Sequence, residues 1–150
     1  MKIEAMDPAD PRVRVLLEQL DAYQSALYPP ESNHLEDVAA LRLPNVLFVA
    51  ASLDTVIAAC GAVKTMDDDT YGEIKRVFVA PDYRGRGLSL AIMRVLERHL
   101  IDHGVPLARL ETGVLQTEAL SLYRRLGYAQ RAPFGHYQPD PLSVFMEKRL

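Results

Sequence analysis

The stretch Val77-Phe78-Val79-Ala80-Pro81-Asp82-Tyr83-Arg84-Gly85-Arg86-Gly87-Leu88-Ser89 reads as a strand, a glycine-containing loop and the start of a helix. Glycines at 85 and 87 allow the backbone to turn tightly and to approach a ligand without an obstructing Cβ atom. The first N–H groups of the following helix have no partner within that helix, so they point at whatever lies before it. The stretch therefore predicts an anion site that fits a pyrophosphate group.

Two other phosphate-binding motifs are absent from this loop. The spacing Gly85-x-Gly87 lacks the third glycine of G-x-G-x-x-G, and no Lys-Ser/Thr pair follows, as it would in a P-loop. Taken alone, a G-x-G loop is equally typical of an ordinary strand-to-helix turn.

The hydrophobic pattern outward from this loop predicts a mixed α/β fold. Helices are expected at residues 7–27, 34–43, 88–103 and 117–126. Strands are expected at residues 2–6, 46–52, 56–65, 71–80, 107–112 and 142–148. Asp7-Pro8 is expected to cap the first helix, and Thr117 the last. The residues at 46–80 are expected to form an antiparallel meander, with a hairpin at 53–55.

Length and composition predict one domain spanning residues 1–150. The chain has 150 residues, is 49% hydrophobic and contains a single cysteine, so it can bury a full core without a disulfide. No Cys/His cluster with metal-ligand spacing occurs, and we expect no metal. The absence of an apolar leader or a membrane-length apolar run predicts a cytoplasmic protein with no membrane partner.

The net charge of −3 conceals a division along the chain. Residues 1–70 carry 5 basic and 12 acidic side chains, whereas residues 71–150 carry 12 and 8. The excess of positive charge therefore lies in the half that contains the predicted anion site. Because the chain is acidic overall and has no basic stripe with interleaved aromatics, we expect no nucleic-acid partner.

Two blocks of the sequence resemble those of the GNAT superfamily of acetyl-CoA-dependent N-acyltransferases. Residues 84–89 resemble its R/Q-x-x-G-x-G/A signature, and Ala119-Leu120-Ser121-Leu122-Tyr123-Arg124-Arg125-Leu126-Gly127-Tyr128 resembles its A-x-x-L-Y-x-x-x-G-F/Y block. Ser89 departs from the usual Gly or Ala, and Gln116 stands where Asn is frequent. The resemblance implies a GNAT fold, with a mostly antiparallel sheet, a splayed parallel strand pair near Val79 and Thr112, and flanking helices.

The resemblance also implies where acetyl-CoA, the expected co-substrate, would bind. The loop amides would hold its pyrophosphate, the splayed strands would admit its pantetheine arm, and strand N–H groups would polarise the acetyl carbonyl. The residues expected to bind it are Val77, Phe78, Val79, Arg84, Gly85, Arg86, Gly87, Leu88, Ser89, Gln116 and Tyr123.

Tyr123 and Glu73 are the expected catalytic residues. The alternatives are a core aromatic residue for Tyr123 and, for Glu73, an exposed strand residue paired with Lys75 or Arg76. By resemblance, the Tyr123 hydroxyl would approach the cofactor sulfur and protonate, or hydrogen-bond to, the departing thiolate. Glu73 resembles a glutamate that some GNAT enzymes use as general base, with Glu111 as the second candidate. Strand alternation is expected to place Glu73 and Lys75 on one face of the sheet and Arg76 on the other.

The expected activity is direct transfer of an acetyl group from acetyl-CoA to a primary amine of a small molecule or peptide. The Pro- and aromatic-rich segment at residues 134–141 is a candidate wall of the acceptor site or a surface turn. The rival hypothesis is a non-catalytic acyl-CoA-binding module on the same fold, which would need neither Glu73 nor Tyr123. A monomer and a homodimer are both compatible with the sequence.

Overall fold

Seven strands form one mixed sheet in a computed structural model that describes residues 1–33 and 37–150. The strand order is β1-β2-β3-β4-β5-β7-β6, and every neighbouring pair is antiparallel except β4 with β5. The strands are β1 (Lys2–Ala5), β2 (Val46–Leu53), β3 (Val56–Thr65), β4 (Gly72–Val79), β5 (Leu107–Gly113), β6 (Ala129–Arg131) and β7 (Ser143–Arg149). This arrangement confirms the predicted fold class. The short strand β6 is an element that the sequence analysis missed.

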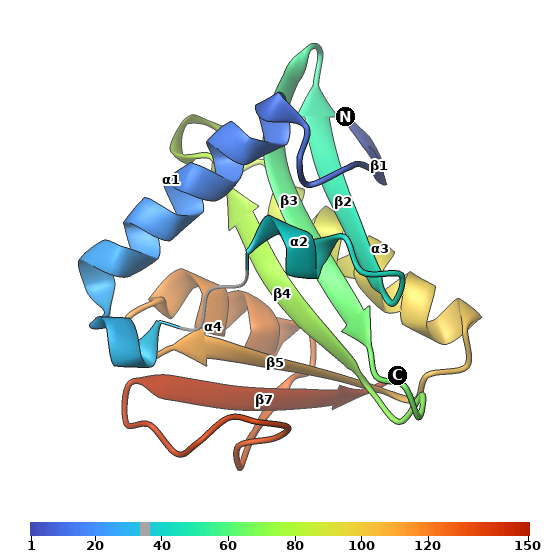
Figure 1. Cartoon of the computed structure of the whole chain (residues 1–150), viewed down its shortest axis with the longest axis vertical. Helices are drawn as coiled ribbons and strands as arrows, with labels where there is room; N and C mark the ends of the chain where they lie inside the picture. The colour runs from blue at the N-terminus through green and yellow to red at the C-terminus, as the bar shows by residue number, and fades with distance from the viewer. Residues whose placement is uncertain (34–36) are drawn as a thin grey trace.

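Helices cover both faces of the sheet. They are α1 (Pro11–Leu27), α2 (Val38–Leu41), α3 (Leu88–Asp102) and α4 (Thr117–Arg125). Figure 1 shows α1 and α2 in front of the sheet and α3 and α4 behind it. One buried cluster joins α3 and α4 to the sheet, and a second joins α1 to the opposite face through Phe48, Cys60 and Phe78.

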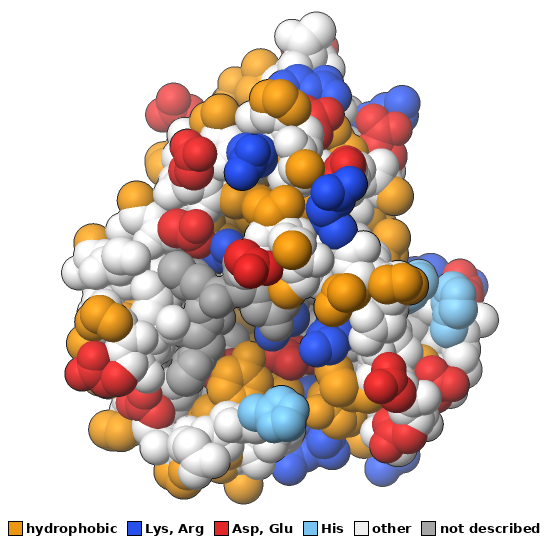
Figure 2. Space-filling model, viewed as in Figure 1, with side chains coloured by type: hydrophobic (Ala, Val, Ile, Leu, Met, Phe, Trp, Pro, Cys, Tyr) orange, Lys and Arg blue, Asp and Glu red, His pale blue; other side chains and the backbone are white. Residues whose placement is uncertain are grey.

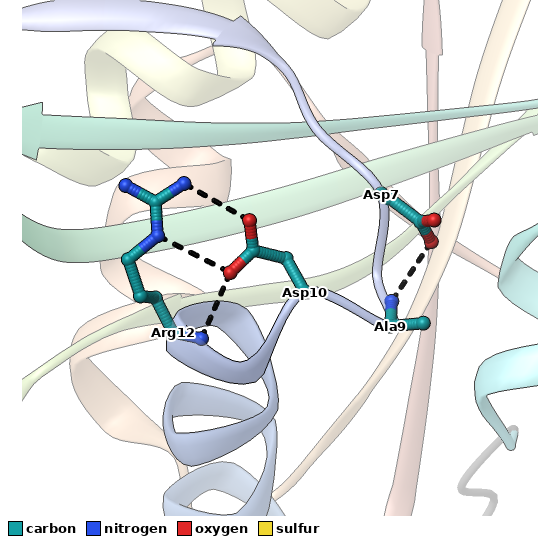
Figure 3. Close-up of polar contacts among 4 residues, drawn as sticks. All are labelled: Asp7, Ala9, Asp10 and Arg12. Carbon is teal, nitrogen blue, oxygen red and sulfur yellow. Dashed lines mark hydrogen bonds and ion pairs between the residues drawn. The ribbon is translucent and has the colours of Figure 1, made fainter.

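The first helix begins three residues later than predicted. Asp10, not Asp7, is the N-cap, and its carboxylate accepts a hydrogen bond of 2.9 Å from the Arg12 N–H (Figure 3). Asp7 instead accepts from the Ala9 N–H and forms a turn before the helix. The motif Asp-Pro occurs twice in this segment, and only Asp10-Pro11 places proline in the first helical turn.

Two other predicted helix starts need correction. The helix expected at residues 34–43 is seen only as α2, which Asp37 caps by accepting from the Ala40 N–H; residues 34–36 lie outside the described residues. Thr117 is the first residue of α4 and not its cap, which is Gln116. The Gln116 side chain makes no capping bond to the helix.

The parallel strands β4 and β5 pair only over their first residues. The register joins Gly72 to Ala108 and Ile74 to Leu110, and no further pairs form. Figure 1 shows the two strands side by side at one end and diverging towards their carboxyl ends. The predicted splay is therefore present and begins just beyond Ile74.

A β-bulge in β4 overturns the predicted alternation of side chains. The pairing with β3 shifts between Cys60 and Ala62, so that Gly61 lies opposite two residues of β4, and Arg76 takes a positive φ of 58°. The extra residue resets the alternation, which leaves the Arg76 side chain on the same face as Glu73 and Lys75. This face carries α1, and Arg76 there forms an ion pair with Asp21 of that helix.

Candidate active site

A groove of about 1100 Å³ runs from the splay of β4 and β5 to the amino end of α3. Val77 to Val79 line one side, and α4 lines the other with Tyr123. Arg84, Arg94 and Arg125 lie around it, so its rim is basic. The groove thus has the length and charge that a long anionic cofactor needs.

The loop before α3 has the geometry of an anion cradle. Gly85 and Gly87 have φ values of 78° and 75°, and a Cβ atom added at either position would meet nothing within 4 Å. Gly87 is the N-cap of α3, and no side chain caps the N–H groups of the first turn. Those N–H groups and the positive end of the helix dipole are directed at the groove.

Most residues expected to bind the cofactor line this groove. Besides the three strand residues, they are Arg84, Gly85, Gly87, Leu88, Ser89, Gln116 and Tyr123. Arg86 is the exception, because its guanidinium lies 5.2 Å from the centroid of the Tyr83 ring and the residue is not part of the lining. Arg84 is held by aromatic rings, at 5.7 Å from Tyr23 and 5.9 Å from Phe78.

Tyr123 is buried in the core that α3 and α4 share, yet it also lines the groove. Its ring meets the ring of Tyr128 edge to face, at 6.0 Å between centroids. Burial, and then the charge of Glu111, raise the pKa of the Tyr123 phenol to about 12. Tyr123 therefore keeps its proton at neutral pH and can serve as a hydrogen-bond donor.

A second, smaller pocket of about 60 Å³ opens on the side of the sheet that carries α1. Gln116 lines both this pocket and the groove, so the two cavities lie on either side of this residue near the splay. The Gln116 Oε1 atom accepts a hydrogen bond of 3.0 Å from the Gly113 N–H, which holds the turn between β5 and α4.

Glu73 lies in the small pocket and is 7% exposed. Lys75 Nζ lies 3.1 Å from its Oε2 atom, and the Tyr137 hydroxyl donates to the same oxygen at 2.5 Å. Tyr137 belongs to the loop before β7, which Phe134 anchors against Phe145. Residues 134–141 were expected to form either a wall of the acceptor site or a surface turn. Because this segment supplies Tyr137 to the lining of the small pocket, the structure favours a wall.

Glu111 also lines the small pocket, with weaker partners than Glu73 has. Its Oε2 atom accepts a long hydrogen bond, 3.4 Å, from the Ser143 hydroxyl. Burial, and then the charge of Glu73, raise the pKa of Glu111 to about 7. A carboxyl group that exchanges its proton near neutral pH can act as a general base there.

Arg76, Tyr137 and Tyr23 are parts of the site that the sequence analysis did not assign. Arg76 enters the pocket because of the bulge, for which the residue pattern of β4 offers no signal. In the sequence, Tyr137 was recognisable only as a member of an aromatic loop, and no local pattern marked Tyr23.

Within the described ranges, no group of three or more His, Cys, Asp or Glu side chains is arranged to hold a metal ion. Over the same ranges, no helix has the length and apolar character needed to cross a membrane.

The chain belongs to the GNAT family of acetyltransferases, as residues 13–128 match the family described as Acetyltransferase (GNAT) family. The predictions of family and of an acyltransferase are thereby confirmed. It is 43% identical over 143 residues to an IAA acetyltransferase of Azospirillum brasilense, with 95% of this chain and 94% of the relative covered.

Solved structures agree with this assignment. A crystal structure from Klebsiella pneumoniae, described as an acyl-CoA N-acyltransferase, has a TM-score of 0.82 and 36% identity, with 99% of this chain and 97% of that one covered. PaiA N-acetyltransferase from Thermoplasma acidophilum, in complex with coenzyme A, has a TM-score of 0.74 over both full lengths. At 17% identity the latter likeness shows the fold alone.

Proposed function

We propose that this protein transfers an acetyl group from acetyl-CoA directly to a primary amine, with Glu111 as the proton acceptor. The observation that carries the proposal is that Gln116 lines both the basic groove, which contains Tyr123, and the small pocket, which contains Glu111. The coenzyme A bound in the PaiA structure supports the choice of cofactor. The loop at 84–89 and the first turn of α3 would hold its phosphates.

The transfer needs a neutral amine and a polarised carbonyl. Glu111 takes a proton from the ammonium group, and the amine nitrogen then attacks the acetyl carbonyl carbon. Backbone N–H groups of β4 beyond Ile74, where β5 no longer pairs with it, would stabilise the oxyanion. The C–S bond then breaks as the nitrogen gives up a second proton, which leaves the amide. The departing thiolate takes up that second proton to become the free thiol, and the proton on Glu111 passes to solvent.

Tyr123 would act on the leaving group mainly as a hydrogen-bond donor. Its pKa is about 12, whereas a thiol ordinarily has a pKa of about 8.5. The raised pKa of the phenol therefore opposes complete proton transfer to the thiolate. A hydrogen bond to the developing negative charge stabilises the transition state without that transfer.

Glu73 is the base that the sequence analysis predicts, with Glu111 as the second candidate, but the contacts of Glu73 argue for a supporting role. It already accepts from Tyr137 and pairs with Lys75, so taking a substrate proton would break a buried ion pair. Its negative charge in turn raises the proton affinity of Glu111.

The pH dependence of kcat/KM tests the base. We expect it to rise with an apparent pKa near 7 in the wild type, from ionisation of Glu111, and to lose that ascending limb in Glu111→Gln. Glu73→Gln should keep the limb and shift it to lower pH, because it removes a neighbouring negative charge. Loss of the limb in Glu73→Gln alone would assign the base to Glu73.

Tyr123→Phe tests the donor. We expect kcat to fall by about 10- to 100-fold, the worth of a hydrogen bond to a charged group, while the affinity for acetyl-CoA changes by less than about twofold. Unchanged turnover would exclude Tyr123 from the reaction.

A separate measurement tests whether the protein is an enzyme at all. Release of the coenzyme A thiol in the presence of amines separates the enzyme from a non-catalytic acyl-CoA-binding module, which would release none.

A further inference from the structure

The loop at residues 84–89 contacts helix α1 through the side chain of Arg84. The guanidinium carbon of Arg84 lies 5.7 Å from the centroid of the Tyr23 ring and 5.9 Å from that of the Phe78 ring. The two rings face each other across α1 and β4, with 6.4 Å between their centroids. Arg84 also donates a long hydrogen bond, 3.4 Å, from Nε to the Val79 carbonyl. A helix from the first part of the chain thus helps to hold a residue of the loop.

Burial in the core does not explain why an aromatic residue stands at position 23. The Tyr23 ring is 37% exposed and lines the groove. The residues that anchor α1 to the sheet are the buried ones, Val13, Leu16, Leu17 and Leu20. Removal of the Tyr23 ring should therefore leave the packing of α1 largely intact.

The charge of α1 does not explain the contact either. The helix is formally neutral, because its charged residues are Arg12, Arg14, Glu18 and Asp21. Figure 2 shows side chains of both signs on the face of the molecule that carries α1. What α1 contributes to the loop is therefore the aromatic ring of Tyr23.

An aromatic ring can hold a guanidinium without using its hydrogen-bond donors. A cation within about 6 Å of a ring centroid is attracted by the negative face of the ring, and a guanidinium is weakly hydrated and stacks readily. The contact uses the charge and not the N–H bonds, so the same side chain can still donate to phosphate oxygens. A side chain that is already held loses less conformational entropy when a ligand binds it.

Resting on the proposed binding of acetyl-CoA in the groove, we propose that Tyr23 is a positioning residue that holds Arg84 ready for the pyrophosphate of the cofactor. Tyr23 acts through Arg84, whose guanidinium it orders at the edge of the groove. The affinity for acetyl-CoA thus depends on a residue of α1, outside the loop that binds the phosphates.

The first test measures acetyl-CoA binding by calorimetry in two variants at position 23. Tyr23→Leu removes the ring and should weaken binding by about two- to fivefold, the worth of an exposed cation–π contact. Tyr23→Phe keeps the ring and should bind as tightly as the wild type. Circular dichroism and urea denaturation check that both variants fold as the wild type does.

The second test asks whether Tyr23 acts through Arg84. In the background of Arg84→Gln, which lacks the cation, Tyr23→Leu should cause no further loss of affinity. A merely structural role of Tyr23 would weaken binding equally in both backgrounds.

Tyr83→Leu is the matched control. The Arg86 guanidinium lies 5.2 Å from the centroid of the Tyr83 ring, so this variant breaks a contact of the same kind beside the same loop. Arg86 and Tyr83 are not part of the groove lining. Tyr83→Leu should therefore leave the affinity for acetyl-CoA unchanged.

The outcomes separate this inference from the proposed function. If Tyr23→Leu binds acetyl-CoA as tightly as the wild type, or loses as much affinity in the Arg84→Gln background, the inference is wrong and the proposed acetyl transfer stands. An equal loss in Tyr23→Phe or in Tyr83→Leu would also overturn it. If the wild-type protein does not bind acetyl-CoA, the proposed function fails and the inference fails with it.

Discussion

Glu111 holds its proton in the folded protein at pH values at which the unfolded chain has lost it. Its pKa is raised from 4.5 to about 7 by burial and by the charge of Glu73. The folded state therefore binds more protons than the unfolded state across this interval, and the free energy of unfolding falls as the pH rises through it. The same residue that would serve as a base thus weakens the fold once it ionises.

This linkage predicts the behaviour of Glu111→Gln. As the pH rises from about 4.5 to 7, the free energy of unfolding of the wild type should fall by at most about 3 kcal/mol because of Glu111. Glu111→Gln should lack that loss, and be more stable than the wild type at pH 8. Urea denaturation at several pH values measures the free energy of unfolding of the two proteins. Glu18→Gln, on the exposed side of α1, is the control. Parallel pH profiles for the wild type and Glu111→Gln would contradict the raised pKa.

At the scale of single elements, the loop from β4 to α3 combines a strained backbone conformation with open space. Gly85 and Gly87 both have positive φ values, and nothing lies within 4 Å of an added Cβ atom. Such positions cost a non-glycine residue about 1 kcal/mol or more of backbone strain. In such a variant, relief of the strain would turn the N–H groups of the loop away from the groove, so we expect cofactor affinity to depend on both glycines.

Gly87→Ala tests this coupling, and Gly104→Ala is its control. Gly104, at the other end of α3, has a φ of 71° and equally open space around it. Both substitutions should lower the free energy of unfolding by about 1 kcal/mol. Only Gly87→Ala should weaken acetyl-CoA binding, by about fivefold or more, as measured by calorimetry. Equal affinities in the two variants would show that the loop amides do not hold the cofactor.

Across the whole molecule, charge is divided in a way that the net value of −3 hides. The fold brings Arg125 of α4 together with Arg84 and Arg94 around one groove. Exposed charges on such a rim attract an anionic ligand over distances of about one Debye length, and salt screens them.

The groove therefore predicts that the KM for acetyl-CoA rises with salt concentration. The double variant Arg94→Gln, Arg125→Gln should raise KM several-fold at low salt and reduce its dependence on salt, at about 0.3–1 kcal/mol for each exposed charge. Arg98→Gln is the control, because Arg98 lies on α3 but pairs with Asp102 outside the groove. A salt dependence that the double variant leaves unchanged would contradict this role of the rim.

Residue spacing in the sequence predicted the order of most elements and the glycine-containing loop at 84–89, because these features depend on chain conformation over a few neighbours. The splayed strands and the candidate roles of Tyr123, Glu73 and Glu111 came from the resemblance to the GNAT superfamily. The predicted cap of the first helix lies three residues before the observed cap Asp10, and the predicted cap of the last helix one residue after Gln116, because Asp7 and Thr117 are both favoured capping residues locally.

Only the tertiary structure decided which charges share the small pocket. The bulge that turns Arg76 towards α1, the hydroxyl that Tyr137 brings to Glu73, and the burial that raises the pKa of Glu111 all arise from residues far apart in the chain. Strand alternation predicts a side chain's face only while the register is regular, and one extra residue in β4 reversed it for Arg76. The acceptor chemistry of this protein thus depends on packing between distant segments, which no local pattern records.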